Sequence, residues 1–176
     1  SLRRQRQMCI RDSLETQPEK AIKLEKNALA QIENITADNA RLVSNLHANL
    51  GGLYRMNGYP DLAREHMEKS ISLLDQFNLL HINDSIPQIA NYAMFLTEQQ
   101  EPERGISELQ KLSGIIKEYH SDECLDYAKV QENLATIYLM TANLSHSKTH
   151  FKKAFKIYEK IWADKPEMIE AKYQEI

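Results

Sequence analysis

The stretch Asn49-Leu50-Gly51-Gly52-Leu53-Tyr54 decides the fold, because related stretches return at constant spacing along the chain. The second copy, 42 residues later, is Asn91-Tyr92-Ala93-Met94-Phe95-Leu96, and the third is Asn133-Leu134-Ala135-Thr136-Ile137-Tyr138. Large apolar residues recur at some positions of this pattern and small residues at others, with no insertion between copies. Such self-similarity at a fixed period is typical of arrays in which each repeat packs on its neighbours.

A short break follows each stretch and leads into a second helical segment, as at residues 57–60 and 99–102. Pro60 and Pro102 suit the first turn of that second helix, where a missing N–H costs little. Small residues recur in both segments of each repeat: Gly51, Ala93 and Ala135 in the first, and Ala63, Gly105 and Ser147 in the second. Because facing small side chains let two helices approach to ~8–10 Å, these positions predict an antiparallel helical hairpin in every repeat.

The sequence predicts an all-α fold with no strand of useful length. The expected helices lie near residues 38–57, 60–78, 85–99, 102–119, 122–141 and 144–162. Thr36 or Asp38, Asp84 or Ser85, and Ser121 or Asp122 are the expected starts of the three first helices. Residues 16–34 predict the second helix of an earlier repeat, and a further first helix is expected to begin at residues 164–166.

The predicted domain organisation is a tail at 1–13 and one repeat domain at 14–176. The domain is expected to comprise a partial repeat at 16–35, full repeats at 36–78, 79–120 and 121–163, and a partial repeat at 164–176. Solenoids normally end in capping units with a polar outer face, and neither end of this sequence shows one. The chain is therefore expected to be a fragment of a longer array.

The first repeat resembles the tetratricopeptide repeat through Leu50-Gly51, Tyr54, Gly58, Ala63 and Met67. The second repeat departs most from that pattern, with Tyr92, Leu96 and Gly105. The usual unit has about 34 residues, whereas the period here is 42, which is similar to the kinesin-light-chain type of repeat. The resemblance covers roughly residues 14–176. It implies an α-solenoid of antiparallel helix pairs with a right-handed superhelical path.

The first thirteen residues differ from the rest, since they contain four arginines and one acidic residue. Arg3 to Asp12 closely resembles one reading frame of a transposase-type sequencing-library adapter, so residues 1–13 are predicted to be non-native. The alternative is a genuine basic N-terminal arm. Without this tail, 18 basic and 24 acidic residues remain, which gives a formal net charge of −6.

Composition and charge exclude several classes of protein. With 42% apolar and 27% charged residues, the chain is too apolar for a disordered tail. No run approaches the ~18 apolar residues that span a membrane, and a net charge of −3 argues against direct nucleic-acid binding, which needs a basic face. Two cysteines form no disulfide framework and favour a reducing, cytoplasmic location.

Asn49, Asn91 and Asn133 occupy the same position in their repeats. The resemblance implies that an asparagine here points into the concave, peptide-binding groove. A carboxamide both donates and accepts hydrogen bonds, so it suits the N–H and C=O groups of a bound peptide backbone. The alternative is that these asparagines bond neighbouring helices and stabilise the stack. Further candidates on the same face are Asn45, Arg55, Met56, Met94, Thr97, Lys129, Thr136 and Met140.

Two properties make these additional residues candidates. Arg55 and Lys129 are suited to an acidic side chain or a terminal carboxylate, although solvated surface charges explain them equally well. The three methionines are suited to an adaptable apolar floor, with core filling as the alternative.

Signals for catalysis or metal binding are weak. His146 and His150 are four residues apart, as are His120 and Cys124, but zinc needs further converging ligands. No phosphate-binding loop or paired-carboxylate motif is present. The sequence thus predicts a non-enzymatic module without metal or cofactor that binds an extended segment of a protein or peptide partner. The alternative is the peptide-sensing or scaffold part of a larger bacterial regulator, such as a transcription factor.

Overall fold

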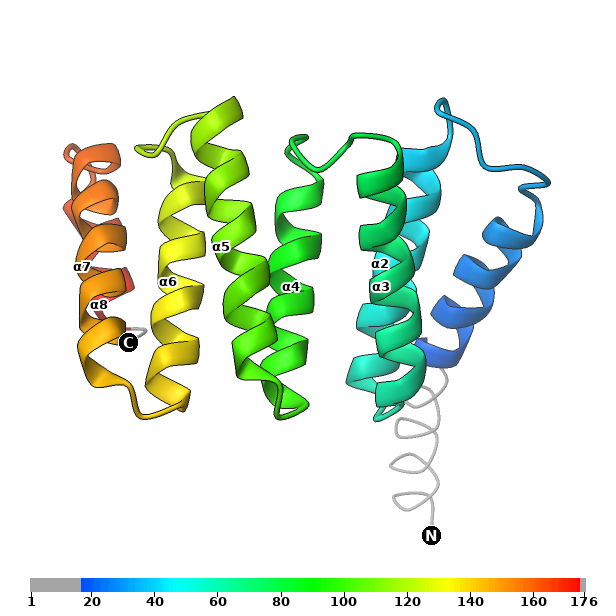
Figure 1. Cartoon of the computed structure of the whole chain (residues 1–176), viewed down its shortest axis with the longest axis horizontal. Coiled ribbons are helices and arrows are strands. Elements are labelled where there is room, and N and C mark those ends of the chain that lie inside the picture. The colour runs from blue at the N-terminus through cyan, green and yellow to red at the C-terminus, as the bar shows by residue number, and fades with distance from the viewer. Residues whose placement is uncertain (1–16, 175–176) are drawn as a thin grey trace, which may run out of the picture. The chain divides into compact units, whose positions relative to one another are not determined.

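The computed structural model describes residues 17–174, which contain eight helices and no strand. This confirms the predicted all-α class (Figure 1). The tail at 1–13, which resembles an adapter, lies outside the described residues. The chain divides into two compact units between Leu79 and Leu80, and each unit is described by itself.

The first unit contains the helical residues 17–30 and the helices α2 (Ala40–Met56) and α3 (Pro60–Gln76). Helices α2 and α3 pack against each other as a hairpin. Their shared core includes Leu50 and Ala63, which are fully buried. The repeat pattern placed these residues on facing helices, and the structure confirms that placement.

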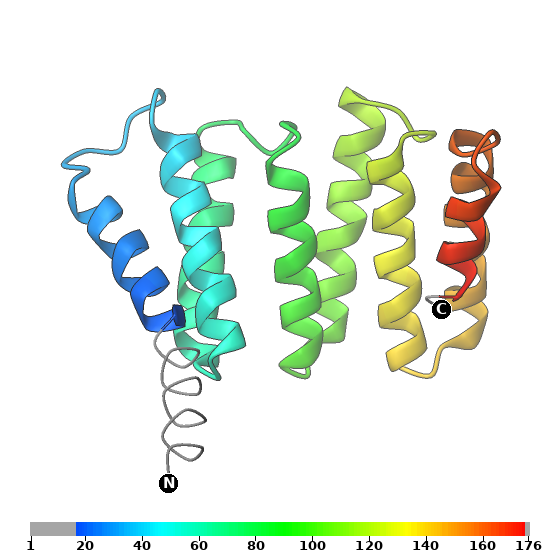
Figure 2. The same ribbon diagram turned by 180° about the vertical axis from the view of Figure 1, so that it is seen from behind.

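The second unit contains α4 (Ser85–Glu98), α5 (Pro102–Tyr119), α6 (Leu125–Met140), α7 (Leu144–Ile161) and α8 (Pro166–Gln174). Helix α4 pairs with α5 and α6 pairs with α7, while α6 also packs on both α4 and α5. The second helices, α5 and α7, face the viewer in Figure 1, and the first helices, α4 and α6, face the viewer in Figure 2. The unit is therefore a two-layer stack of helical hairpins.

The last helix, α8, packs against the hairpin that precedes it. The Tyr173 ring stacks on Phe155 at 4.2 Å between ring centroids, and its hydroxyl donates to Glu159 at 3.1 Å. Lys172 forms an ion pair of 2.8 Å with Glu132 of α6. A first helix of a further repeat was predicted to begin at residues 164–166, and α8 begins at Pro166.

The start of α6 differs from the prediction. A helix was expected from residue 122, but α6 begins at Leu125, because the Cys124 thiol caps it and accepts a hydrogen bond from the Tyr127 N–H at 3.4 Å. Ser121 instead accepts from the Glu123 N–H inside the preceding loop. A thiol is an unusual N-cap, because Ser, Thr, Asp and Asn are the residues usually found at that position.

The start of α2 also lies later than expected. Thr36 and Asp38 were the predicted first residues, whereas α2 begins at Ala40 after Asn39. The Asn39 side chain accepts from the Thr36 N–H at 2.8 Å and donates to the Asn34 carbonyl at 2.9 Å. These bonds close a turn before the helix starts, as asparagine side chains commonly do.

Small residues do bring paired helices close together, as predicted. A Cβ atom at Gly105 of α5 would lie 2.6 Å from the Ala93 carbonyl oxygen of α4 and 2.8 Å from the Thr97 hydroxyl. At Gly51 of α2 it would lie 2.6 Å from the Met67 side chain and 3.3 Å from the Ala63 carbonyl oxygen. The two hairpins differ in which helix carries the glycine.

The turn inside each hairpin has the same backbone conformation. Gly58, Gln100 and Ala142 stand 42 residues apart and all have positive φ, at 76°, 65° and 57°. In each turn the residue that follows donates its N–H to a carbonyl five residues earlier, at 2.8–2.9 Å. This is the Schellman motif, in which glycine is favoured because it lacks the Cβ that strains a left-handed residue.

Glycine at the left-handed position should therefore stabilise the second unit. We expect Ala142→Gly to raise the free energy of unfolding by about 0.5–1 kcal/mol, since relief of the strain exceeds the added entropy of the unfolded chain. Gly58→Ala should lower it by a similar amount. Urea unfolding followed by circular dichroism measures both effects, and a destabilised Ala142→Gly variant would contradict the assignment of strain.

Candidate functional site

Asn91 and Asn133 lie at equivalent positions on the first helices α4 and α6, which pack against each other. Asn91 is exposed and Asn133 is partly exposed. Within residues 17–174, neither side chain has a hydrogen-bond partner. Both carboxamides therefore retain their full capacity to donate and to accept.

Asn49 of the first unit is in a different situation. Its side-chain Nδ2 donates to Glu25 Oε1 at 3.0 Å, which ties α2 to the helical segment at 17–30. The other carboxylate oxygen of Glu25 is buried and has no partner among the described residues. At this position the asparagine bonds a neighbouring helix, as the alternative interpretation of the sequence expects.

The other predicted residues of α2 and α4 fall into two groups. Asn45, Arg55 and Met94 are partly exposed, and Met56 is 84% exposed at the end of α2. Thr97 is buried, and its hydroxyl donates to the Ala93 carbonyl at 3.1 Å. Both groups lie where Gly105 of α5 comes close to α4. Thr97 offers no surface to a partner and belongs to the contact between α4 and α5.

The predicted residues of α6 are all accessible to some degree. Met140 is 57% exposed at the end of the helix, and Thr136 is partly exposed with its hydroxyl bonded to the Glu132 carbonyl at 3.0 Å. Lys129 is exposed and forms an ion pair of 3.8 Å with Asp126, one turn earlier on the same helix. Such a pair between exposed side chains contributes little to stability, so Lys129 is free to exchange its partner.

A repeated polar pair links the two helices of a hairpin, and the sequence reasoning missed it. His47 and His66 join α2 to α3 with 2.8 Å between their Nδ1 atoms. At the equivalent positions 84 residues later, Gln131 Oε1 and His150 Nδ1 join α6 to α7, also at 2.8 Å. The spacing of 84 residues, which is two repeat periods, was the signal in the sequence that the two pairs are equivalent.

Tyrosine rings cover both polar pairs. Tyr54 stacks on His66 and Tyr138 stacks on His150, each with 5.4 Å between ring centroids. Burial lowers the pKa of His47 to about 4, assisted by the nearby charges of His66 and Lys69. Burial likewise lowers the pKa of His66 and that of His150. These rings are neutral near pH 7 and serve as hydrogen-bonding links between helices.

The weak metal-ligand candidates do not converge. Cys124 caps α6, and the His120 ring bonds to the His81 carbonyl at 2.8 Å. His146 bonds to Asn143 at 2.9 Å, and its ring lies tilted at 5.0 Å from that of Tyr138, which His150 also contacts. Across residues 17–174, no group of three His, Cys, Asp or Glu side chains is placed to hold a metal ion.

The second unit is similar to a known family of repeats. Residues 85–160, which comprise almost all of α4 to α7, match the family model of the tetratricopeptide repeat. These two hairpins are similar to tetratricopeptide repeats. The match confirms the resemblance found in the sequence pattern, and it covers most of the second repeat, whose residues depart most from the usual pattern.

Several solved structures have a similar fold. BtubC (BKLC) from P. vanneervenii has a TM-score of 0.74 and 19% identity, and the match covers 84% of this chain and 58% of BtubC. A Podosopora anserina protein assigned as a kinesin light chain, with nearly identical TPR-like repeats, has a TM-score of 0.70 and 15% identity. That match covers 84% of this chain and 70% of the fungal protein. No curated protein sequence matches the chain.

The tetratricopeptide fold has a general role in the proteins that contain it. It is generally a protein–protein interaction module and a non-catalytic scaffold, and proteins that contain it typically bind protein partners. The chain spans 58% of the length of BtubC. Among the helices of residues 17–174, none is long and apolar enough to cross a membrane.

Proposed function

We propose that the first-helix surface of the second unit binds an extended segment of a protein partner, with Asn91 and Asn133 contacting the backbone of that segment. The observation that carries the proposal is the state of these two side chains. They stand at the same repeat position on adjacent helices, they are accessible, and they have no hydrogen-bond partner within residues 17–174. An extended peptide presents alternating N–H and C=O groups that such carboxamides satisfy whatever the peptide's side chains are.

Neighbouring residues supply the selectivity of this surface. The partly exposed Met94 and the exposed Met140 offer apolar contacts that adapt to different side chains. Lys129 offers a positive charge whose exposed partner, Asp126, is readily replaced by an acidic group of the ligand. In the first unit, Asn49 would have to leave Glu25 before it could contact a peptide.

The test is loss of peptide binding when the carboxamides are removed. A peptide selected from a displayed library on the full chain is titrated against the Asn91→Ala/Asn133→Ala variant, and we expect its Kd to rise about tenfold or more. Asn83→Ala replaces an exposed loop asparagine of the same unit and should leave the Kd unchanged. Equal affinities for the double variant and the natural chain would refute the proposal, provided that circular dichroism shows equal helicity.

The alternative, a peptide-sensing or scaffold part of a larger bacterial regulator, stays a prediction from the sequence. It uses the same peptide-binding surface and differs in the domains attached to it. Sequencing the complete gene distinguishes the two, because a helix–turn–helix domain in the same reading frame would support the regulator.

A further inference from the structure

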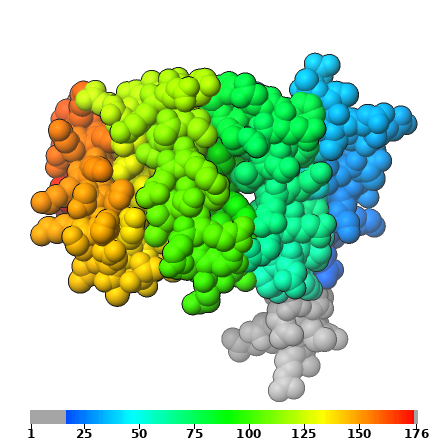
Figure 3. Space-filling view, viewed as in Figure 1, coloured from blue at the N-terminus to red at the C-terminus, as the bar shows by residue number. Residues whose placement is uncertain are grey.

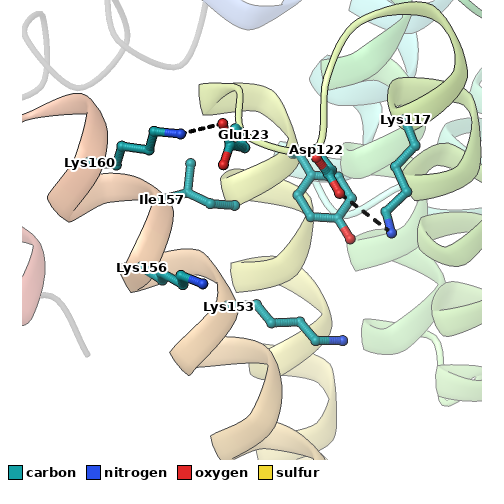
Figure 4. A pocket seen from close by; sticks show the side chains of 8 residues that line it. Lys117, Asp122, Glu123, Lys153, Lys156, Ile157 and Lys160 are labelled. Carbon is teal, nitrogen blue, oxygen red and sulfur yellow. Dashed lines mark hydrogen bonds and ion pairs between the residues drawn. The ribbon is translucent and has the colours of Figure 1, made fainter.

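The second-helix side of the second unit contains a cavity of about 300 Å³. It lies between the end of α5, the start of α6 and the last turns of α7 (Figure 4). In the space-filling view, α6 is visible between α5 and α7 on this side of the unit (Figure 3). Tyr127 and Ile157, which are 7% and 8% exposed, form the apolar part of the cavity wall.

Four lysines surround this wall. Lys153, Lys156 and Lys160 follow one another at spacings of three and four residues along α7, so they project from one face of that helix. Lys117 reaches the cavity from the last turn of α5, and its ammonium group lies 5.3 Å from the centre of the Tyr127 ring.

Only part of this positive charge is neutralised. Glu123 pairs with Lys160, and Asp122 lies 4.0 Å from Lys117. Lys153 and Lys156 are exposed and form no ion pair with any residue in 17–174. The positive surroundings also lower the pKa of Glu123, chiefly through the hydrogen bond from Lys160 and then through the charges of Lys160 and Lys156.

We infer that this lysine cavity is a second interaction surface, which takes an acidic segment of a protein partner. Two unpaired ammonium groups beside an apolar wall complement acidic side chains, whose carboxylates pair with the lysines while their methylene groups contact the wall. The chain as a whole has a formal net charge of −3, so this group of lysines is a local positive region on a protein that is negative overall. Such a region steers an acidic ligand to the cavity. A nucleic acid is disfavoured, because its phosphates would extend past Asp122 and Glu123 on the cavity rim.

The first test uses the full chain and a fluorescein-labelled peptide in which glutamates alternate with glycine and serine. The reference peptide has glutamine in place of each glutamate. We expect saturable binding of the glutamate peptide at low salt, about tenfold tighter than binding of the reference peptide, and weaker binding as salt is added. Equal affinity for the two peptides would overturn the inference.

Matched charge reversals locate the binding. Lys153→Glu/Lys156→Glu should raise the Kd of the glutamate peptide at least about tenfold. Lys148→Glu/Lys152→Glu makes the same change in net charge on exposed residues of the same helix that do not line the cavity, and it should change the Kd less than about twofold. Equal losses in the two variants would mean that net charge alone attracts the peptide, which would overturn the site.

Further measurements separate the remaining outcomes. Lys153→Gln/Lys156→Gln, which removes charge without reversing it, should also weaken binding while circular dichroism remains that of the natural chain. The Asn91→Ala/Asn133→Ala variant should bind the glutamate peptide normally, so failure of this inference is distinguishable from failure of the first-helix proposal. An oligonucleotide that binds more tightly than the peptide and is lost in the same lysine variants would overturn the assignment to a protein partner.

Discussion

Gly105→Ala is expected to lower the free energy of unfolding by about 2–3 kcal/mol, because the added methyl group has no room. It would lie 2.6 Å from the Ala93 carbonyl oxygen, which belongs to the backbone of α4. A backbone atom inside a packed hairpin cannot turn away as a side chain does, so α4 and α5 must separate. That separation would loosen the contact around Leu96 and Leu109, both of which are fully buried.

Gly114→Ala is the matched control for this substitution. Gly114 lies on the same helix, and a Cβ atom there would have no neighbour within 4 Å. Alanine should therefore raise the free energy of unfolding by about 0.5–1 kcal/mol through its higher helix propensity. Urea unfolding of both variants measures the difference in the free energy of unfolding. A Gly105→Ala chain as stable as the unsubstituted one would show that α4 and α5 do not approach each other this closely.

Gly51→Ala should have an effect between those two. The nearest atom to a Cβ at Gly51 is Cγ of Met67 at 2.6 Å, and the nearest backbone atoms, the Met67 nitrogen and the Ala63 carbonyl oxygen, lie farther away at 3.2 and 3.3 Å. The Met67 side chain is buried and must repack to make room, but the backbone of α3 can stay closer to its place than that of α4 can in the Gly105 variant. We expect a loss of about 1 kcal/mol in the free energy of unfolding, measured in the same experiment.

The helices were predictable because local signals and the repeat agree. Pro60 and Pro102 mark the first turns of α3 and α5, which begin at those residues. The left-handed residues Gln100 and Ala142 lack the glycine that usually marks such a turn, and their spacing of 42 residues from Gly58 and from each other was the only signal for them in the sequence. The start of α6 was missed, because the capping atom is the sulfur of Cys124.

The candidate site was less predictable, since it depends on contacts between helices. The repeat pattern placed Asn49, Asn91 and Asn133 at one position, but it carried no information on Glu25, which binds the first of them. Thr97 was assigned to the surface although it follows Ala93 by four residues and therefore shares its buried face. That spacing was a signal which the sequence reasoning did not use.

The lysine cavity could not be found from the sequence, because its members come from separate helices. Lys153, Lys156 and Lys160 share a face of α7, which taken alone indicates only a solvated surface. Lys117 and Tyr127 come from α5 and α6, and only the packing of these helices brings them to the same cavity. The residues that matter for binding are therefore less visible in the sequence than those that determine the repeat.

Acidification is expected to destabilise the protein through its partly buried histidines. The pKa of His47 is about 4 in the folded chain and about 6.5 in the unfolded chain. Above pH 6.5 the ring is neutral in both states, so folding does not depend on it. As the pH falls from 6.5 towards 4, the unfolded chain takes up a proton that the folded chain does not, and unfolding becomes more favourable.

His66 and His150 change the stability in the same direction, because burial lowers the pKa of each. We expect the free energy of unfolding to fall by about 2 kcal/mol between pH 7 and pH 5, a value that allows for screening of these partly exposed rings by solvent. The geometry gives the reason. With 2.8 Å between the Nδ1 atoms of His47 and His66, one nitrogen must accept the proton of the other, and two charged rings cannot both donate.

His47→Gln tests this reasoning, because the chain already contains the resulting pair elsewhere. Gln131 and His150 form it between α6 and α7 at the equivalent positions, with the same 2.8 Å distance. The variant should fold normally, and its stability should fall less between pH 7 and pH 5 than that of the natural chain, since one protonation linked to unfolding is removed. A titration of the His47 ring by NMR with a midpoint at or above 6.5 in the folded chain would contradict the prediction, as would a variant with an unchanged dependence on pH.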